Sequence, residues 1–456
     1  MQNQNWRFLN KVIAGAAVTV LVVSFSSFLV AQEHPIAGTK GAAAEVSERP
    51  VVTNAYVPEV SVAHAENAGL KANTNYVLFS LDGSKPAAVS SPESIVQKVE
   101  TPASMACVYK VGPSYTGCVP NLSINSHPSG GFGAIALVDA YDNPDAASDL
   151  SVFDGQFGLP SVSFTKFYCT TAAVNGGCYT SNTAPAGNTG WGLEEALDIE
   201  WAHVMAPNAA IYLVEAADSG CLDLFYAEQW AGAYVQAAGG GSVSNSWGCG
   251  EFSTEANYDP DFYDSYTATS YFASSGDSGA GVIYPSASPW VVAAGGTTVN
   301  RTASNSHFSS ESCWSGSGGG ASAYEKAQGY QFNLTDGGAR LVPDASFNAD
   351  PASGVYVYDG YNGGWFQVGG TSVSSPSLAG IVNLAGNKAG QGTPFAFQGF
   401  GYLQNQEDYL IYGELPTTVA YKKDWYDVKT GTSGNKAYVL YDLCTGVGSP
   451  RGLLGK

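Results

Sequence analysis

The stretch "WGLEEALDIEWAHVMAPNAAIYLVEA" runs from Trp191 to Ala216 and contains a helix, a stop and a strand in succession. Apolar residues recur at helical spacing from Trp191 to Ala206. Pro207 ends that pattern, because proline has no N–H with which to continue a helix. The apolar run Ala209–Ala216 is typical of a buried strand. The stretch therefore predicts a helix that leads into a strand of a covered sheet.

The same alternation of strand and helix continues along most of the chain. The buried run "AIALVDA" (Ala134–Ala140) predicts a strand, and Pro144–Gly158 predicts the helix after it. Further strands are predicted within residues 242–247, 270–276 and 288–298, and further helices within residues 221–238 and 371–390. This order indicates an α/β fold, with a mainly parallel central sheet covered by helices on both faces. Function is then expected at the carboxyl ends of the strands.

The N-terminus has the order of charges and apolar residues that is typical of an export signal. Arg7 and Lys11 precede the uncharged run Val12–Ala31. We assign residues 1–31 to a signal peptide, although the run is also long enough to be an uncleaved anchor. Residues 32–101 show weak periodicity and predict a short segment or linker, followed by a main domain over residues 102–456. The mature protein is expected to be secreted or extracytoplasmic, with no membrane contact after signal removal.

Eight cysteines agree with export, since an even number in an exported chain indicates disulfides. The natural short-loop pairs are Cys107–Cys118 and Cys169–Cys178. Cys221–Cys249 is a plausible third pair, which leaves Cys313 with Cys444. The sequence alone leaves the connectivity beyond the two short-loop pairs open.

The charge balance excludes some classes of partner. The chain has 39 acidic and 19 basic residues, a net charge of -20. So few cations cannot neutralise phosphates, which argues against nucleic acid and anionic membranes as partners.

The loop "SSGDSGAG" (Ser274–Gly281) contains Gly-Asp-Ser-Gly, the context in which chymotrypsin-like proteases present their nucleophilic serine. That interpretation requires a histidine base for Ser278. None of the five histidines stands in a chymotrypsin-like or subtilisin-like context, and the Gly-x-Ser-x-Gly elbow is missing. Ser278 is therefore not expected to be a nucleophile.

A second serine is better placed. In "VGGTSVSSP" (Val368–Pro376), Ser372 lies where a glycine-rich turn enters an apolar helix. Helix N-termini offer N–H groups and a positive field that suit an activated oxygen or an oxyanion. The alternative is that Ser372 only caps the helix.

Two acids supply a candidate base. Glu194 and Asp198 are four residues apart on the predicted helix and so lie on one face. Close carboxylates raise one another's pKa, so one can hold a proton while the other accepts one. The alternative is a solvated surface pair.

These residues belong to a series of motifs that resembles the sedolisins, the serine-carboxyl peptidases of peptidase family S53. The matching pieces are "LEEALD" (Leu193–Asp198), "SSGDSGAG", "YPSASPWVVAAGGTT" (Tyr284–Thr298), "GGTSVSSP" and "YDLCTGVGSP" (Tyr441–Pro450). They occur in family order from about residue 102 to the C-terminus. The resemblance implies a subtilisin-like α/β fold and a monomeric serine-type endopeptidase that acts on protein or peptide substrates.

The resemblance also implies catalytic roles. Ser372 would be the nucleophile, and Glu194 its general base and then the acid for the leaving amine. Asp198 would hydrogen-bond Glu194, and Asp277 would lie in the oxyanion hole. A carboxyl group donates to an oxyanion only while it is protonated, and a Glu base works where a His would be protonated. Both requirements favour peptide hydrolysis at roughly pH 3–5.

Two further positions match residues that extend the hydrogen-bond chain in some sedolisins. They are Asp139 at the end of its strand and Trp247 in "NSWG". The structural alternatives are a strand-end turn residue for Asp139 and a packed core aromatic for Trp247.

One calcium ion is implied by the same resemblance. Its ligands would be the side chains of Asp427 and Asp442 with the carbonyls of Val428, Tyr438 and Leu440, oxygen ligands that suit a hard cation. Tyr438 and Leu440 stand where the family usually has glycines, which is a departure in the loop. The alternative is that the two aspartates are plain turn residues.

The front of the chain departs from the family as well. Sedolisins are usually made with a long folded prodomain, whereas about seventy residues separate the predicted signal from the main domain here. This shortening favours the competing interpretation of a non-catalytic exported binding or surface protein on the same fold. An unrelated disulfide-stabilised adhesin would leave the ordered motifs unexplained.

Overall fold

The computed structural model describes residues 54–95, 98–169, 183–262, 269–335, 338–388, 406–415 and 418–456. The chain divides into two units, residues 1–48 and 49–456, and every described residue belongs to the second. The predicted signal or anchor at residues 1–31 lies outside the described residues. Within the described ranges, none of the helices combines the length and the apolar character that a membrane crossing requires.

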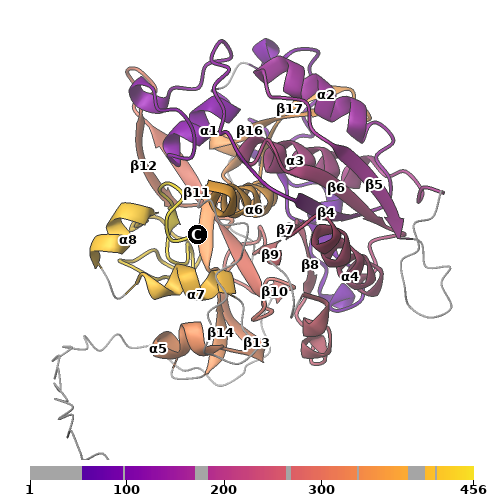
Figure 1. The fold of residues 1–456 in the computed structure, drawn as a ribbon, viewed down its shortest axis with the longest axis vertical. Helices are drawn as coiled ribbons and strands as arrows, with labels where there is room; N and C mark the ends of the chain where they lie inside the picture. The colour runs from indigo at the N-terminus through magenta and orange to yellow at the C-terminus, as the bar shows by residue number, and fades with distance from the viewer. Residues whose placement is uncertain are drawn as a thin grey trace, which may run out of the picture. The chain divides into compact units, whose positions relative to one another are not determined.

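An eight-stranded sheet forms the centre of the second unit (Figure 1). Its order is β12-β11-β9-β7-β4-β6-β5, and β15 also pairs with β11. All these pairs are parallel except β11 with β12. The strands are β4 (Ala134–Ala140), β5 (Phe164–Cys169), β6 (Ala210–Ala216), β7 (Gly241–Asn245), β9 (Thr269–Ser274), β11 (Val291–Arg301), β12 (Phe308–Cys313) and β15 (Ala345–Asn348).

Helices cover both faces of this sheet, as strand β4 makes clear. Ile135 and Leu137 pack into one apolar core, while Ala136 and Val138 pack into another. Successive side chains of a strand point to opposite faces, so the two cores lie on opposite sides of the sheet. The first core contains α2 (Ala146–Phe157), α3 (Thr189–Met205) and α6 (Thr371–Lys388), and the second contains α4 (Cys221–Ala237). The predicted α/β class is confirmed.

Local sequence explains the ends of helix α3. The Asn188 side chain accepts hydrogen bonds from the N–H groups of Gly190 and Trp191, at 2.9 and 3.2 Å. This satisfies two of the N–H groups that a helix leaves free at its start. The helix ends at Met205, two residues before Pro207. Every predicted strand and helix named above appears within a few residues of its expected position.

The described part of the segment before residue 102 packs with the main domain. It belongs to the same compact unit as the main domain and contributes three short strands. Strands β1 and β3 extend the order β1-β3-β17-β16, and β2 pairs with β8 in the order β10-β8-β2. The described part of residues 32–101 is therefore not separated from the main domain at Pro102. These strands are β1 (Ala55–Tyr56), β2 (Asn73–Thr74), β3 (Val77–Phe79), β8 (Trp247–Gly250), β10 (Ile283–Tyr284), β16 (Val355–Asp359) and β17 (Gly364–Gly369).

Smaller elements complete the unit, and disulfides join three parts of it. The remaining helices and strands are α1 (Pro102–Val108), α5 (Phe332–Thr335), α7 (Gln406–Gly413), α8 (Thr418–Asp424), β13 (Gly320–Lys326), β14 (Ala339–Val342), β18 (Trp425–Tyr426) and β19 (Ser449–Pro450). The disulfides Cys107–Cys118, Cys221–Cys249 and Cys313–Cys444 are present as predicted. The predicted Cys169–Cys178 pair involves Cys178, which lies outside the described residues.

Candidate active site

Helix α6 begins where the carboxyl ends of several parallel strands meet, and Ser372 is its second residue. Ser372 is fully buried, and its Oγ lies 3.3 Å from the carbonyl oxygen of Ser246, to which it donates. Pro376 lies four residues further along the helix and has no N–H, so the Ser372 carbonyl lacks its usual helical partner. The Ser246 hydroxyl lies 3.4 Å from that carbonyl oxygen.

The N-terminus of α6 is capped from outside the helix. Asp277 follows strand β9, and its Oδ1 accepts hydrogen bonds from the Thr371 N–H at 2.7 Å and the Thr371 hydroxyl at 2.8 Å. Ser372 is therefore not the residue that caps this helix.

Asp277 has two carboxyl oxygens in different surroundings. Oδ1 receives the two Thr371 bonds, while Oδ2 is buried without a hydrogen-bond partner among the described residues. Burial raises the pKa of Asp277 to about 8, and the Thr371 hydrogen bonds offset only part of that rise. Below that pH the group is protonated, and the proton belongs on Oδ2 because Oδ1 already accepts two bonds.

Glu194 and Asp198 lie on one face of α3, and both are fully buried. This excludes the alternative of a solvated surface pair. Burial first, then the charges of Asp198 and Asp139, raise the pKa of Glu194, whereas the Ser372 hydroxyl lowers it as a neighbouring donor. Ser372 is thus close enough to Glu194 to affect its titration. Neither Glu194 carboxyl oxygen meets hydrogen-bond geometry with another described residue, because the Ser372 hydroxyl is turned toward Ser246.

Asp198 is held by a residue that sequence reasoning missed. The Ser246 hydroxyl donates to Asp198 Oδ1 at 2.7 Å. Burial and then the Asp139 charge raise the pKa of Asp198, while the Ser246 hydroxyl and the neighbouring Glu194 carboxyl group lower it. Ser246 precedes Trp247 in "NSWG", so the motif that indicates Trp247 also contains the serine that holds Asp198.

Asp139 and Trp247 occupy different positions relative to the acids. Asp139 is the last residue but one of β4, is fully buried, and raises the pKa of both Glu194 and Asp198 through its charge. Burial raises the pKa of Asp139 itself to about 8. The Trp247 indole N–H donates to the carbonyl oxygen of Val138 at 2.9 Å, which fixes the ring beside the end of β4 without bonding a carboxyl group.

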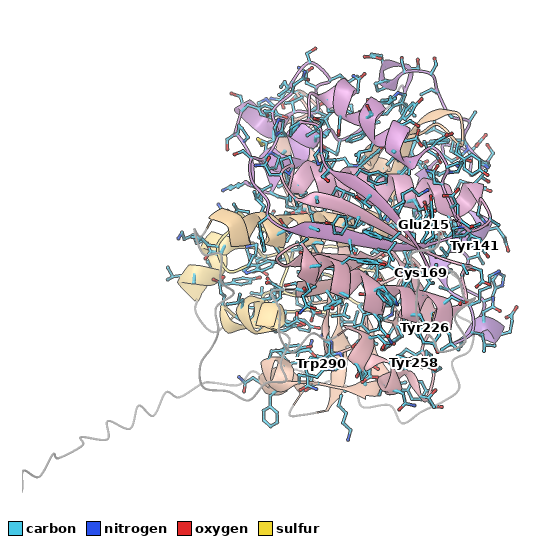
Figure 2. The ribbon with its side chains drawn as sticks, turned by 45° about the vertical axis from the view of Figure 1, so that its right-hand side comes forward. Tyr141, Cys169, Glu215, Tyr226, Tyr258 and Trp290 are labelled. Carbon is cyan, nitrogen blue, oxygen red and sulfur yellow. A yellow bond between two sulfur atoms is a disulfide. The ribbon has the colours of Figure 1, made fainter. Side chains whose placement is uncertain are left out.

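Glu195 lies next to Glu194 in sequence but faces other groups. Its Oε2 accepts from the Asn143 N–H at 3.0 Å, and Glu215 is the neighbouring charge that most raises its pKa after burial. Glu215 pairs with the Lys166 ammonium at 2.6 Å. Figure 2 shows Glu215 with Cys169 and Tyr141, where β6, β5 and β4 end together. Glu194 is therefore the acid of the Glu-Glu pair that faces Ser372.

Ser278 is exposed on the loop after β9. His203, the histidine of α3, is fully buried, and its Nε2 lies 2.9 Å from the carbonyl oxygen of Pro160. Burial lowers the pKa of His203 to about 4.

The predicted calcium ligands lie in one loop region near the C-terminus, where other groups of the chain donate to both aspartates. Asp427 Oδ1 accepts from the Leu440 N–H at 2.9 Å, and Asp442 Oδ2 accepts from the Tyr438 N–H at 3.1 Å. The Tyr421 hydroxyl lies among oxygens of Asp427, Leu440 and Val447, at 3.2, 3.4 and 2.7 Å.

These donors satisfy the oxygens that a cation would need. Among the residues described, no group of three or more His, Cys, Asp or Glu side chains is arranged to hold a metal. The predicted Ca²⁺ at Asp427, Val428, Tyr438, Leu440 and Asp442 is therefore not confirmed.

Comparison with known proteins shows which proteins this chain is similar to. The chain is 30% identical to kumamolisin from Bacillus sp. (strain MN-32) over 320 residues, which cover 62% of this chain and 53% of kumamolisin. It is 31% identical to sedolisin from Pseudomonas sp. (strain 101) over 183 residues, which cover 38% of this chain and 28% of sedolisin. The chain is therefore similar in sequence to peptidases of the sedolisin family. It spans about half the length of kumamolisin and less of sedolisin.

The fold agrees with this similarity. The structure of Pseudomonas sedolisin, a serine-carboxyl proteinase in complex with pseudo-iodotyrostatin, matches with a TM-score of 0.60 and 23% identity. The match covers 78% of this chain and 96% of that one. It confirms the expected subtilisin-like α/β fold. No family model matches the sequence.

Proposed function

We propose that this chain is an exported serine-carboxyl endopeptidase of the sedolisin family that hydrolyses peptide bonds at acid pH. One observation carries the proposal: the Ser372 N–H, which donates to the carbonyl oxygen of Asn75 at 2.9 Å, and the Asp277 Oδ2, which has no partner among the described residues, both lie at the start of α6. Each of these groups can donate a hydrogen bond to an oxygen that becomes negative when Ser372 attacks a carbonyl carbon. The three disulfides of the described residues support export.

In the first half of the reaction, Glu194 accepts the Ser372 proton as Oγ attacks the peptide carbonyl. The tetrahedral oxygen receives the Ser372 N–H and the protonated Asp277 Oδ2. Glu194 then gives its proton to the departing amine, which leaves an ester between Ser372 and the acyl part of the substrate. In the second half, water attacks the ester carbonyl carbon while Glu194 accepts a proton from it. Glu194 then returns that proton to Ser372 Oγ as the ester bond breaks, which releases the acid product.

Asp198 and Asp139 set the protonation of Glu194. Their charges oppose its ionisation, so the three acids share protons and the partly protonated cluster supplies both a base and a donor. Ser246 holds Asp198 in place through its hydroxyl. We expect Asp277 to set the upper pH limit of the peptidase activity. Loss of its proton replaces a hydrogen-bond donor to the oxyanion by a negative charge. No step passes through calcium.

The test is hydrolysis of a denatured protein between pH 3 and pH 7. We expect Ser372→Ala to abolish it and Ser278→Ala, in the exposed loop, to leave it within about twofold. Absence of cleavage at every pH would favour a non-catalytic binding protein on this fold. Activity that depends on Ser278 would overturn the assignment of the nucleophile.

A further inference from the structure

A lysine and two acids share one face of the sheet where β4, β6 and β5 lie side by side (Figure 1). Asp139 of β4 and Glu215 of β6 are register partners, so their side chains leave the sheet on the same side. Lys166 of β5 is the register partner of Leu213, which stands two residues before Glu215. Leu213 packs into the apolar core that contains α3. Asp139, Glu215 and Lys166 therefore all face the helix that carries the catalytic acids.

The Lys166 ammonium is held by three oxygens. Its Nζ lies 2.5 Å from Asp142 Oδ1, 2.6 Å from Glu215 Oε1 and 2.8 Å from the carbonyl oxygen of Asn143. The Lys166 side chain is only 15% exposed, so solvent screens its charge weakly. The N–H of Asn143 in turn donates to Glu195 Oε2 at 3.0 Å. The loop after β4 thus joins the lysine to an acid of α3.

The acids of α3 face mainly negative neighbours. After burial, the charges that most raise the pKa values of Glu194, Glu195 and Asp198 belong to other carboxyl groups, Asp139 among them in each case. Among the described groups with the largest effect on these acids, Lys166 is the only cation, and its charge lowers the pKa of Glu195. A base for Ser372 must be ionised at acid pH, so a nearby positive charge opposes the rise that burial causes.

The groups that contact Lys166 leave its charge uncancelled on the side of α3. Burial raises the pKa of Glu215 to about 8, and the Lys166 charge offsets only part of that rise, so Glu215 is protonated at acid pH. Burial also raises the pKa of Tyr168, whose ring centroid lies 5.6 Å from Nζ, so this hydroxyl is neutral as well. Asp142, in the loop after β4, is then the carboxyl group that balances Lys166.

We propose that Lys166 is a positioning residue for the peptidase reaction, because its charge lets the acids beside Ser372 accept a proton at acid pH. The inference rests on the proposed function. Lys166 acts from a distance, since it lies on β5 and Asp139 lies on β4, with β6 between them. Neighbouring strands are about 4.8 Å apart, which places these two strands about 10 Å from each other.

The size of the effect follows from that separation. At about 10 Å and an effective dielectric constant of about 20, one unit charge changes a pKa by about 1 unit. Loss of a positive charge raises the pKa of a carboxyl group. Without Lys166 the base would hold its own proton up to a higher pH, and below that pH it could not accept the proton of Ser372.

The test is the pH dependence of kcat/KM, whose acid limb reports the ionisation of the base in the free enzyme. In Lys166→Met the acid limb should move to higher pH by about 1 unit. Lys166→Arg keeps the charge, so its acid limb should stay within about 0.3 pH unit of the parent value. Lys423→Met removes an exposed lysine of α8 and is the matched control, for which we expect no shift.

A second pair of variants separates the charge of Lys166 from its packing. Asp142→Asn removes the carboxylate that balances the lysine, so the acid limb should move to lower pH. The double variant Lys166→Met/Asp142→Asn lacks both charges, and its acid limb should return to within about 0.5 pH unit of the parent value. Damage to packing alone would not shift the two single variants in opposite directions.

Circular dichroism shows which variants fold, and Asp142→Asn decides the question if Lys166→Met does not. Acid limbs that stay in place in both variants, or that move in the same direction, would overturn this inference while the proposed peptidase stands. An unmoved or raised acid limb in Asp142→Asn would do so by itself. If the parent hydrolyses no denatured protein at any pH, the proposed function fails and this inference falls with it.

Discussion

Asp277→Asn gives a quantitative test of how the site holds its proton. The amide can keep both contacts of the protonated acid, with its oxygen on Thr371 and its NH₂ in the place of Oδ2, but it does not titrate. In the parent protein, burial raises the Asp277 pKa from 3.8 to about 8. A carboxyl group with a raised pKa contributes stability that is fully present below pH 3.8 and is lost as pH rises toward 8.

The magnitude follows from the same two values. Each pH unit between them lowers the free energy of unfolding by about 1.4 kcal/mol, so the parent loses about 2.5 kcal/mol through Asp277 between pH 4 and pH 6. The Asn variant is spared this loss. We therefore expect its free energy of unfolding, relative to the parent, to rise by about 2.5 kcal/mol over that interval. The other buried acids titrate in both proteins and cancel in the difference.

The assay is urea unfolding followed by circular dichroism at pH 4, 5 and 6, with Ser372→Ala in both proteins to prevent self-digestion. The exposed Asp82 is a control of opposite sign, because its hydrogen bonds with Ser84 lower its pKa. Asp82→Asn should not gain stability as pH rises. A difference between Asp277→Asn and its parent that stays constant from pH 4 to pH 6 would refute the raised pKa of Asp277.

Two further predictions concern the acids of α3. Glu194→Gln should lower kcat, measured in initial-rate assays, by at least about 100-fold. Glu195→Gln is the matched control one residue away, and its kcat should stay within about tenfold of the parent value. Comparable losses in the two variants would contradict the assignment of Glu194 as the base. Ser246→Ala removes a hydrogen bond that lowers the pKa of Asp198, so the acid limb of the pH–rate profile should move to higher pH. An acid limb that stays in place in this variant would show that Asp198 does not control it.

The helices and strands that a pattern of neighbouring residues marks could be predicted from the sequence. The apolar run at Ala134–Ala140 gave a strand with the bounds of β4, and Asn188 and Pro207 frame helix α3 near its expected ends. The i, i+4 spacing also placed Glu194 and Asp198 on one face. What the sequence left open was whether that face is buried, which depends on packing against α6.

The contributions that were missed come from distant pairing. Strand β2 is two residues long and has no periodicity of its own, and it exists because it pairs with β8 more than 170 residues later. The contact between Asn75 and Ser372 spans an even longer separation, and no local signal marks it. The expected calcium site is not confirmed: its two aspartates lie in one loop region, where main-chain N–H groups and the Tyr421 hydroxyl donate to them.

The most direct measurement of the central claim is the site of covalent labelling by a serine-reactive fluorophosphonate at pH 4. Mass spectrometry of the digested protein should place one label on Ser372, and the label should be lost in Ser372→Ala and retained in Ser278→Ala. A label on Ser278, or no label in a protein that still hydrolyses peptides, would contradict a mechanism in which Ser372 is the nucleophile.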